Sequence, residues 1–202
     1  GRTNIKMDVP NRSPDAANKS VTADTVTTQF AANGKDISHT VAVGNAQLVI
    51  SPLAPSENNY QTTVNAPKFD CEFFPAGSDP KTCIAATAVK TVRVPTQPAA
   101  DRGTQTLTSD KLIANFDAGS RELAALEATG NAKFNERDRN GTSEKITYTT
   151  ADQTVRLRGG SPNVWDSKAR AKAPEIDWNT RDEVSELRGG ASTTYFSVSN
   201  TG

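Results

Sequence analysis

A gapless internal repeat is the feature of this 202-residue chain that most constrains its fold. Residues 21–50 can be laid on residues 107–136, which lie 86 positions further along. Repeats stack into elongated bodies with long binding surfaces, and they seldom form a single catalytic pocket. The identical pairs include Thr22 and Thr108, Asp24 and Asp110, Phe30 and Phe116, Gly44 and Gly130, Asn45 and Asn131, and Ala46 and Ala132.

Apolar and polar residues alternate with period two inside each copy, which is typical of antiparallel strands. Residues 121–129 have a composition that suits a helix, but the repeat assigns them to a strand. The interior glycines Gly44 and Gly130 indicate a bend in their strands. We therefore predict an all-β fold, an elongated antiparallel sheet of repeated hairpins with open edges.

The domain organisation follows from the same repeat. Residues 1–20 contain Pro10 and Pro14 among polar residues, and they are expected to form an arm or linker. Residues 21–202 are expected to form one continuous two-part body, with a first repeat over about 21–104 and a second over about 105–197. A Pro-containing loop near residues 51–59 is expected to be an insertion in the first copy.

The charge balance excludes some partners. Lys and Arg together number 23 and Asp and Glu number 23, so there is no net field to attract nucleic acid. The sequence has no apolar run of about 18 residues that could span a bilayer. A local basic cluster of Lys168, Arg170 and Lys172 has the alternate spacing of one strand face, so it could contact lipid phosphates or an acidic partner, or form a solvated face.

The two cysteines, Cys71 and Cys83, are separated by a stretch that holds the turn residues Pro75, Gly77 and Pro80. A disulfide across a hairpin fits this spacing and would place the chain outside a reducing cytosol. Two reduced cysteines on neighbouring strands are the alternative. With His39 as the single histidine, the sequence predicts no metal site, and it predicts no cofactor.

An enzyme is the competing class, because some elongated β folds are carbohydrate-active enzymes that use carboxylates. Asp24 and Asp110 recur at equivalent positions, which favours a structural role such as bonding a turn. His39 has Ala125 as its repeat counterpart and no nucleophile motif beside it. We therefore assign no catalytic residue.

Several segments carry a resemblance to a known family. They are residues 107–112 (LTSDKL), 126–134 (LEATGNAKF), 143–148 (SEKITY) and 155–164 (VRLRGGSPNV). In these segments the chain resembles the OstA-like family of lipopolysaccharide-transport proteins, which includes LptA, LptC and the N-terminal domain of LptD. The resemblance is strongest over about residues 105–197.

The resemblance implies a twisted, open-edged β-jellyroll that encloses an apolar groove. It also implies a non-enzymatic protein in the periplasm of a Gram-negative bacterium, which binds the acyl chains of lipopolysaccharide. Like subunits or other jellyroll proteins would join it end to end by pairing of edge strands.

A lipid conduit needs a row of inward apolar side chains, although the same residues could simply fill a sandwich core. A structural filament subunit would use the same edges with a packed interior. The residues that we expect to line the groove are Leu112, Phe116, Leu126, Ala128, Ala132, Phe134, Ile146, Tyr148, Val155 and Leu157.

Overall fold

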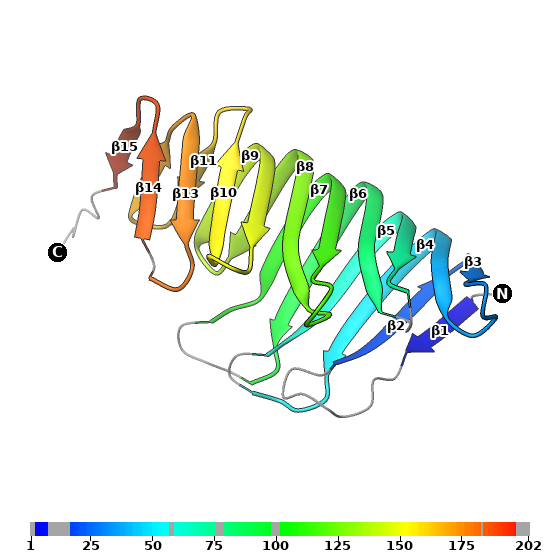
Figure 1. Cartoon of the computed structure of the whole chain (residues 1–202). Coiled ribbons are helices and arrows are strands. Elements are labelled where there is room, and N and C mark those ends of the chain that lie inside the picture. The colour runs from blue at the N-terminus through cyan, green and yellow to red at the C-terminus, as the bar shows by residue number, and fades with distance from the viewer. Residues whose placement is uncertain are drawn as a thin grey trace.

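The computed structural model describes residues 3–7, 17–56, 59–75, 79–97, 102–182 and 184–196. Within them the chain forms one 15-stranded sheet without helices, and every strand pair is antiparallel. The sheet is elongated, with the two chain ends at opposite ends of the molecule (Figure 1). These features confirm the predicted all-β, open-edged architecture of repeated hairpins. No helix that could cross a membrane is found among these residues.

The strands follow one another along the sheet nearly in sequence order. Their bounds are β1 Thr3–Met7, β2 Ala17–Ala23, β3 Thr25–Phe30, β4 Ile37–Pro52, β5 Tyr60–Phe73, β6 Pro80–Pro95, β7 Gln105–Phe116, β8 Leu123–Glu136, β9 Arg139–Thr149, β10 Thr154–Arg158, β11 Asn163–Trp165, β12 Ala169–Lys172, β13 Glu175–Asn179, β14 Val184–Arg188 and β15 Ser192–Tyr195.

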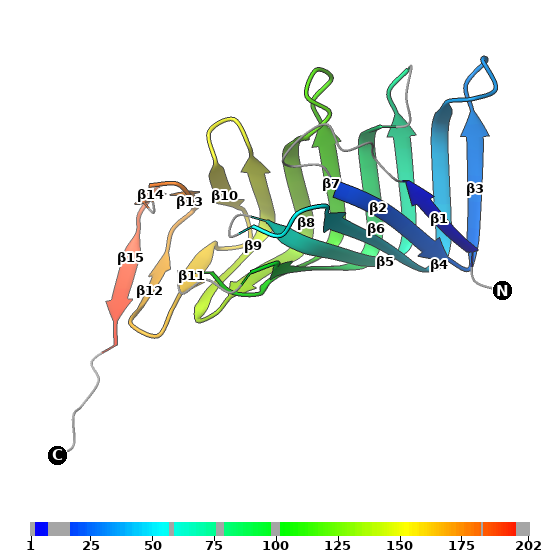
Figure 2. The same ribbon diagram turned by 90° about the horizontal axis from the view of Figure 1, so that it is seen from below.

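The sheet is folded lengthwise into two walls, because its long strands bend in the middle. One half of β9 pairs with β10 and its other half pairs with β11. In the same way, β4 pairs with β3 through one half and with β2 through the other. We call the side that holds β3, β10, β13 and β14 the first wall, and the side that holds β1, β2, β11, β12 and β15 the second wall (Figure 2).

The line where the walls meet, here called the crease, is built from β-bulges and small residues. Each pairing between successive strands from β4 to β9 shifts register at this line. A bulge bends its strand, so a row of bulges folds the whole sheet. Most residues buried at the crease are small, which lets the two walls converge. They are Ala23, Ala46, Ala66, Ser109, Ala132, Ser143 and Ala173, and the larger Val89 is the exception.

The bends repeat every 43 residues, which is half of the spacing found in the sequence. Phe30, Phe73 and Phe116 each end a strand at a bulge in three successive hairpins. The positive-φ pairs follow the same period, at residues 44–45, 87–88 and 130–131. The 86-residue repeat therefore spans two hairpins, and a divergent middle copy lies between the two similar ones.

The expectation of an arm or linker over residues 1–20 needs correction. Strand β1 and the first part of β2 lie within these residues, because Ile5 and Met7 alternate with polar residues and β1 pairs along β2. Residues 1–2 and 8–16 lie outside the described part. Between β4 and β5 the first copy has residues 53–59, whereas its counterpart in the second copy, between β8 and β9, has only Arg137 and Asp138, which agrees with the expected insertion.

Asn140 and Gly141, which have the composition of a turn, lie inside β9. The turn is formed by Arg137 and Asp138 instead. A Cβ atom at Gly141 would overlap the ring of Phe134 on the paired strand, so the glycine makes room for an aromatic neighbour.

Candidate functional site: the inner face of the folded sheet

The concave side of the folded sheet, between the two walls, carries rows of cross-strand neighbours that run along the molecule. The row of the first wall next to the crease is apolar throughout, and we call it the first-wall deep row. From Ala42 to Ile176 its members are at most 6% exposed. In order along the sheet the row is Val26, Ala42, Phe69, Ala85, Leu112, Ala128, Ile146, Leu157, Ile176 and Leu187.

The next row on the same wall lies two residues further from the crease, and we call it the first-wall rim row. Its side chains are half-buried from Thr28 to Trp178, so they form the accessible part of the inner face. They are small near the N-terminal end and large near the C-terminal end. The row is Thr28, Thr40, Cys71, Cys83, Ala114, Leu126, Tyr148, Val155, Trp178 and Ser185.

The disulfide predicted from the sequence is present in this rim row. Cys71 and Cys83 face each other across β5 and β6, with their Cα atoms 4.1 Å apart. Beside them the hydroxyls of Thr28 and Thr40 lie 3.3 Å apart. The first-wall rim row therefore begins with short side chains and a covalent link between strands.

The second wall repeats the deep row on its own side of the crease. This second-wall deep row is apolar along most of its length, and its buried Thr91 hydroxyl has no hydrogen-bond partner. The row is Ile5, Val21, Leu48, Val64, Thr91, Leu107, Phe134, Gly141, Val164, Ala171 and Thr193. Apolar side chains thus line both sides of the crease.

The second-wall rim row differs, because charged and polar side chains enter the inner face there. Arg93 donates a hydrogen bond of 2.7 Å to Gln105, and its guanidinium lies 4.4 Å from the centre of the Tyr60 ring. Gln105 in turn donates to Glu136 at 3.1 Å. The row is Met7, Lys19, Ile50, Thr62, Arg93, Gln105, Glu136 and Arg139.

Two of these cations are perturbed by their concave surroundings. Burial lowers the pKa of Lys19, and the nearby Asp79 carboxylate partly opposes that effect. Desolvation also lowers the pKa of Arg93, although its side chain is still open to solvent. Both cations lie on the concave side of the sheet, each beside an aromatic ring.

Among the described residues, three ring contacts join the walls across the inner face. In one of them the Arg139 guanidinium of the second wall lies 5.8 Å from the ring centre of Trp178 on the first wall. The rings of Phe134 on the second wall and Trp178 on the first wall stack with their centres 5.9 Å apart. Nearer the N-terminal end, the ammonium of Lys19 lies 5.9 Å from the ring centre of Phe116. The aromatic pair lies where the rim side chains are largest, so it narrows the C-terminal part of the inner face.

All ten residues predicted to line a groove lie on this inner face. Leu112, Ala128, Ile146 and Leu157 belong to the first-wall deep row, and Leu126, Tyr148 and Val155 belong to the first-wall rim row. Ala132 and Phe134 continue the face onto the second wall, and Phe116 lies at the open end of β7. The sequence did not indicate the charged residues of the second wall. The alternation of side chains along a strand could have placed them on the inner face. Lys19 and Arg93 lie two residues from Val21 and Thr91, so they face the same side of the sheet.

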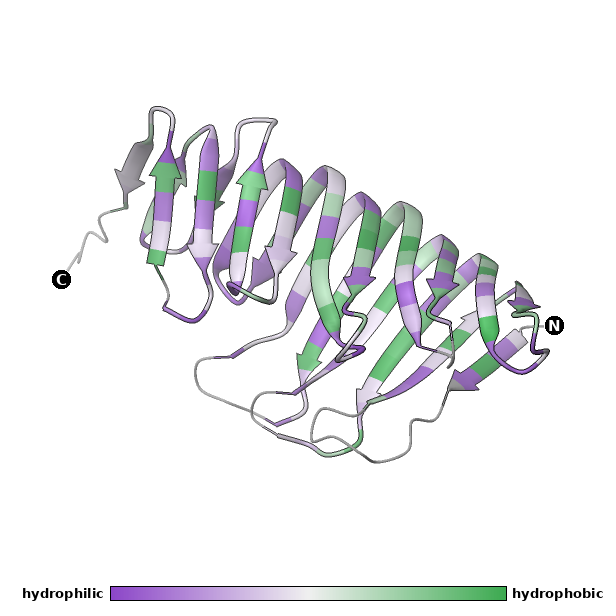
Figure 3. Cartoon of the chain, in the orientation of Figure 1, coloured by the Kyte–Doolittle hydropathy of each residue, from purple (hydrophilic) through white to green (hydrophobic). Residues whose placement is uncertain are grey.

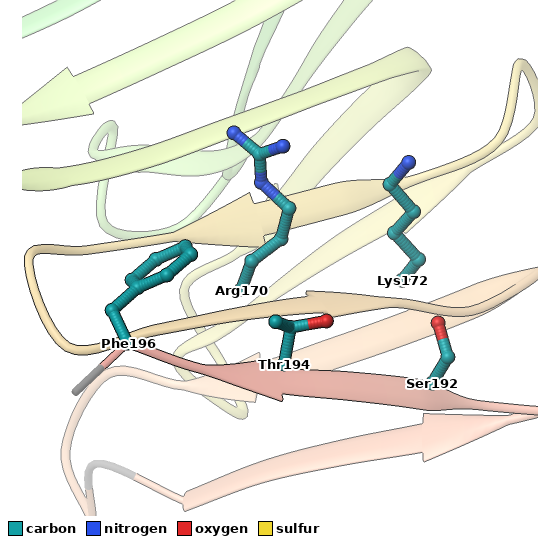
Figure 4. Close-up of a pocket in the computed structure, with 5 residues that line it drawn as sticks. All are labelled: Arg170, Lys172, Ser192, Thr194 and Phe196. Atoms are coloured by element: carbon teal, nitrogen blue, oxygen red, sulfur yellow. The ribbon is translucent and has the colours of Figure 1, made fainter.

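The basic cluster lies on the opposite surface. Arg170 and Lys172 face outward on β12, while Ala171 between them belongs to the second-wall deep row, and Lys168 lies in the preceding turn. A depression of about 230 Å³, shown in Figure 4, is lined by Arg170, Lys172, Ser192, Thr194 and Phe196. A lipid phosphate bound there would therefore be outside the folded sheet.

The residues weighed for the competing enzyme class, Asp24, Asp110 and His39, have structural partners. Asp24 and Asp110 accept hydrogen bonds from Asn45 and Asn131, at 2.9 and 3.3 Å, and hold the crease. His39 on the outer face lies 2.6 Å from Asp70. These hydrogen bonds agree with the structural role predicted for the two recurring aspartates.

Comparison with known proteins gives a family for part of the chain. Residues 99–184 match the sequence model of the family described as "LptA/(LptD N-terminal domain) LPS transport protein". No curated protein matches the chain. Among solved structures, one match is LptH of Pseudomonas aeruginosa, titled as the LptA-homologous periplasmic component of the lipopolysaccharide transport device. It is 10% identical, with a TM-score of 0.34 over 87% of this chain and 93% of that one.

The matched residues include the strands from β7 to β13, whose sequence carried the resemblance described above. Over residues 99–184 the chain is thus similar to the LptA and LptD N-terminal domain family of lipopolysaccharide-transport proteins.

Proposed function

We propose that this protein binds the acyl chains of lipopolysaccharide, or of a related lipid, along its inner face and passes them on without covalent chemistry. The observation that carries the proposal is the pair of apolar deep rows, which run along the sheet on both sides of the crease. Removing a methylene group from water is favourable by about 0.8 kcal/mol of free energy. A long apolar face can therefore hold an acyl chain at any point along its length.

The half-buried first-wall rim row favours a lipid-binding face rather than the closed core of a β-sandwich. A sandwich core would bury these side chains, whereas Leu126, Tyr148 and Val155 remain partly accessible. The colouring in Figure 3 shows apolar and polar residues alternating along the strands, so that each wall has two unlike faces.

The compartment that we propose is the periplasm, or another extracytoplasmic space. The Cys71–Cys83 disulfide supports it, because structural disulfides persist in oxidising compartments. The match of residues 99–184 to the model of a lipopolysaccharide-transport family supports the same assignment.

The partners that we propose are other jellyroll sheets, joined through the two ends. Within the described chain, β1 and β3 at one end and β14 and β15 at the other each pair on one side only. Tyr195 and Val184 at the C-terminal end are 80% and 61% exposed. The same edges would serve a filament subunit, which is the second candidate.

Photocrosslinking tests lipid binding directly. A photoreactive residue at Leu126, on the inner face, should form adducts with lipopolysaccharide. The matched control is the next residue of β8, Glu127, which faces outward and pairs with Lys145. Equal yields at the two positions, or no adduct at Leu126, would contradict the proposal and favour the filament.

A further inference from the structure

The polar rim row of the second wall has a chemistry that the acyl chains do not require. The first wall is apolar or uncharged from the crease through its rim row, whereas charged side chains, three cations and one anion, enter the rim row of the second wall: Lys19, Arg93, Arg139 and Glu136. The cross-section is therefore asymmetric. An amphiphile fits it in one orientation, with its chains against the first wall and the crease.

We propose that Lys19 and Arg93 bind the anionic headgroup of the transported lipid and so fix its orientation along the second wall. This inference rests on the proposed function, since the headgroup reaches these residues only if the chains occupy the inner face. The ligand chemistry is that of phosphate groups on an acylated lipid. Ammonium and guanidinium groups are the side chains that bind phosphate best.

The placement of the two cations supports a headgroup rather than a structural ion pair. Lys19 on β2 and Arg93 on β6 are separated by three strand spacings, or about 14 Å. Each lies against an aromatic ring, Phe116 and Tyr60 respectively, which holds the side chain in the opening. Neither forms an ion pair within 4.0 Å with another residue of the described part of the chain.

The surrounding charges are mixed, so the site is not a simple basic patch. Asp79 lies near Lys19, while Glu136 and Arg102 lie near Arg93. Glu136 accepts a hydrogen bond from Gln105, which directs its carboxylate toward the amide. Desolvation weakens the competition of water for both cations, which strengthens their attraction to a phosphate.

The test compares two lipid probes on the full chain. The probes are a phosphorylated lipopolysaccharide and the same preparation after enzymatic removal of its phosphates. Lys19→Gln and Arg93→Gln should each weaken binding of the phosphorylated probe by about tenfold, the effect of losing one charge-assisted hydrogen bond. Binding of the dephosphorylated probe should be unchanged.

The control is Lys90→Gln, on the outward face of the same strand as Arg93, and thermal unfolding of each variant checks its fold. Equal weakening of both probes by Arg93→Gln would overturn the inference, because it would indicate a packing role. Unchanged binding of the phosphorylated probe would overturn it as well. Failure of the unmodified protein to bind either probe would instead reject the proposed function.

Discussion

At the scale of single residues, the crease depends on positions where only a residue without a side chain fits. Gly130 has a φ of 77°, and a Cβ atom there would overlap the side chain of Asp110. Gly44 has the same relation to Asp24. The recurrence of Gly, Asn and Asp in the sequence thus reflects a bend in the sheet and not a shared chemical step.

Replacement of Gly130 tests this reading. Gly130→Ala should lower the free energy of unfolding by about 2–4 kcal/mol, because it adds a steric overlap to the backbone strain. Gly34→Ala is the control, since Gly34 has a similar φ of 66° in a turn with nothing within 4 Å of the added atom. The control substitution should lower the free energy of unfolding, measured in urea, by only about 1 kcal/mol. Equal losses would show that the overlap is relieved.

A second residue-scale prediction concerns acid stability. Hydrogen bonds from His39 and then from Lys68 lower the pKa of Asp70 below its ordinary value. A lowered folded-state pKa stabilises the fold above the unfolded pKa of about 3.9, and this contribution is lost as the pH falls through the folded value. Asp70→Asn should therefore make unfolding less sensitive to pH below about 4. An unchanged pH profile would contradict the assignment.

At the scale of elements, the three hairpins that follow the 43-residue period, β3–β4, β5–β6 and β7–β8, differ chiefly in how their strands are held together. The middle hairpin lacks the Gly-Asn pair of the other two, with Thr87 and Ala88 at positive φ, and it alone carries the disulfide. The covalent link joins β5 to β6 in the part of the first-wall rim row where side chains are smallest.

Reduction of the disulfide tests its contribution. Because the chain has only two cysteines, any effect of a reductant on unfolding belongs to this bond. Loss of a link that closes a loop of this size should cost roughly 3 kcal/mol in denaturant unfolding. The variant with Cys71→Ala and Cys83→Ala should be equally destabilised and insensitive to reductant, and a persisting response to reductant would contradict the account.

The sequence predicted elements best where the repeat supported the local pattern. Residues 121–129 could have been helical by composition, but the repeat correctly indicated a strand, β8. The inner face of β7 to β10 followed from alternation alone. Strand β1 was missed because five residues give a weak pattern. The charged residues of the second-wall rim row were missed because the sequence does not show that the sheet folds and turns them toward the first wall.

The scale of the whole molecule is where sequence reasoning was weakest. The 43-residue period was hidden because the middle copy retains small or apolar residues at the crease but few identities. The folding of one sheet into two walls depends on a row of bulges, and each bulge is visible only from the pairing of two strands.

End-to-end assembly is a prediction at this scale. Sedimentation should show association that increases with protein concentration, since exposed edge strands pair with other sheets. Tyr195→Lys should weaken this association by placing a charge at the C-terminal edge. Val43→Lys, at a 46% exposed site within the sheet, should leave it unchanged. If both variants associate like the unmodified protein, the C-terminal edge is not the contact.

The chain contains its own pair of probes for the central claim that lipid chains occupy the inner face. Trp178 lies on the inner face in the first-wall rim row, whereas Trp165 faces outward beside Arg170. Lipid with brominated acyl chains should quench the fluorescence of Trp178, so quenching should persist in Trp165→Phe and disappear in Trp178→Phe. Quenching that persists in Trp178→Phe and disappears in Trp165→Phe would place the chains outside the folded sheet and contradict the account.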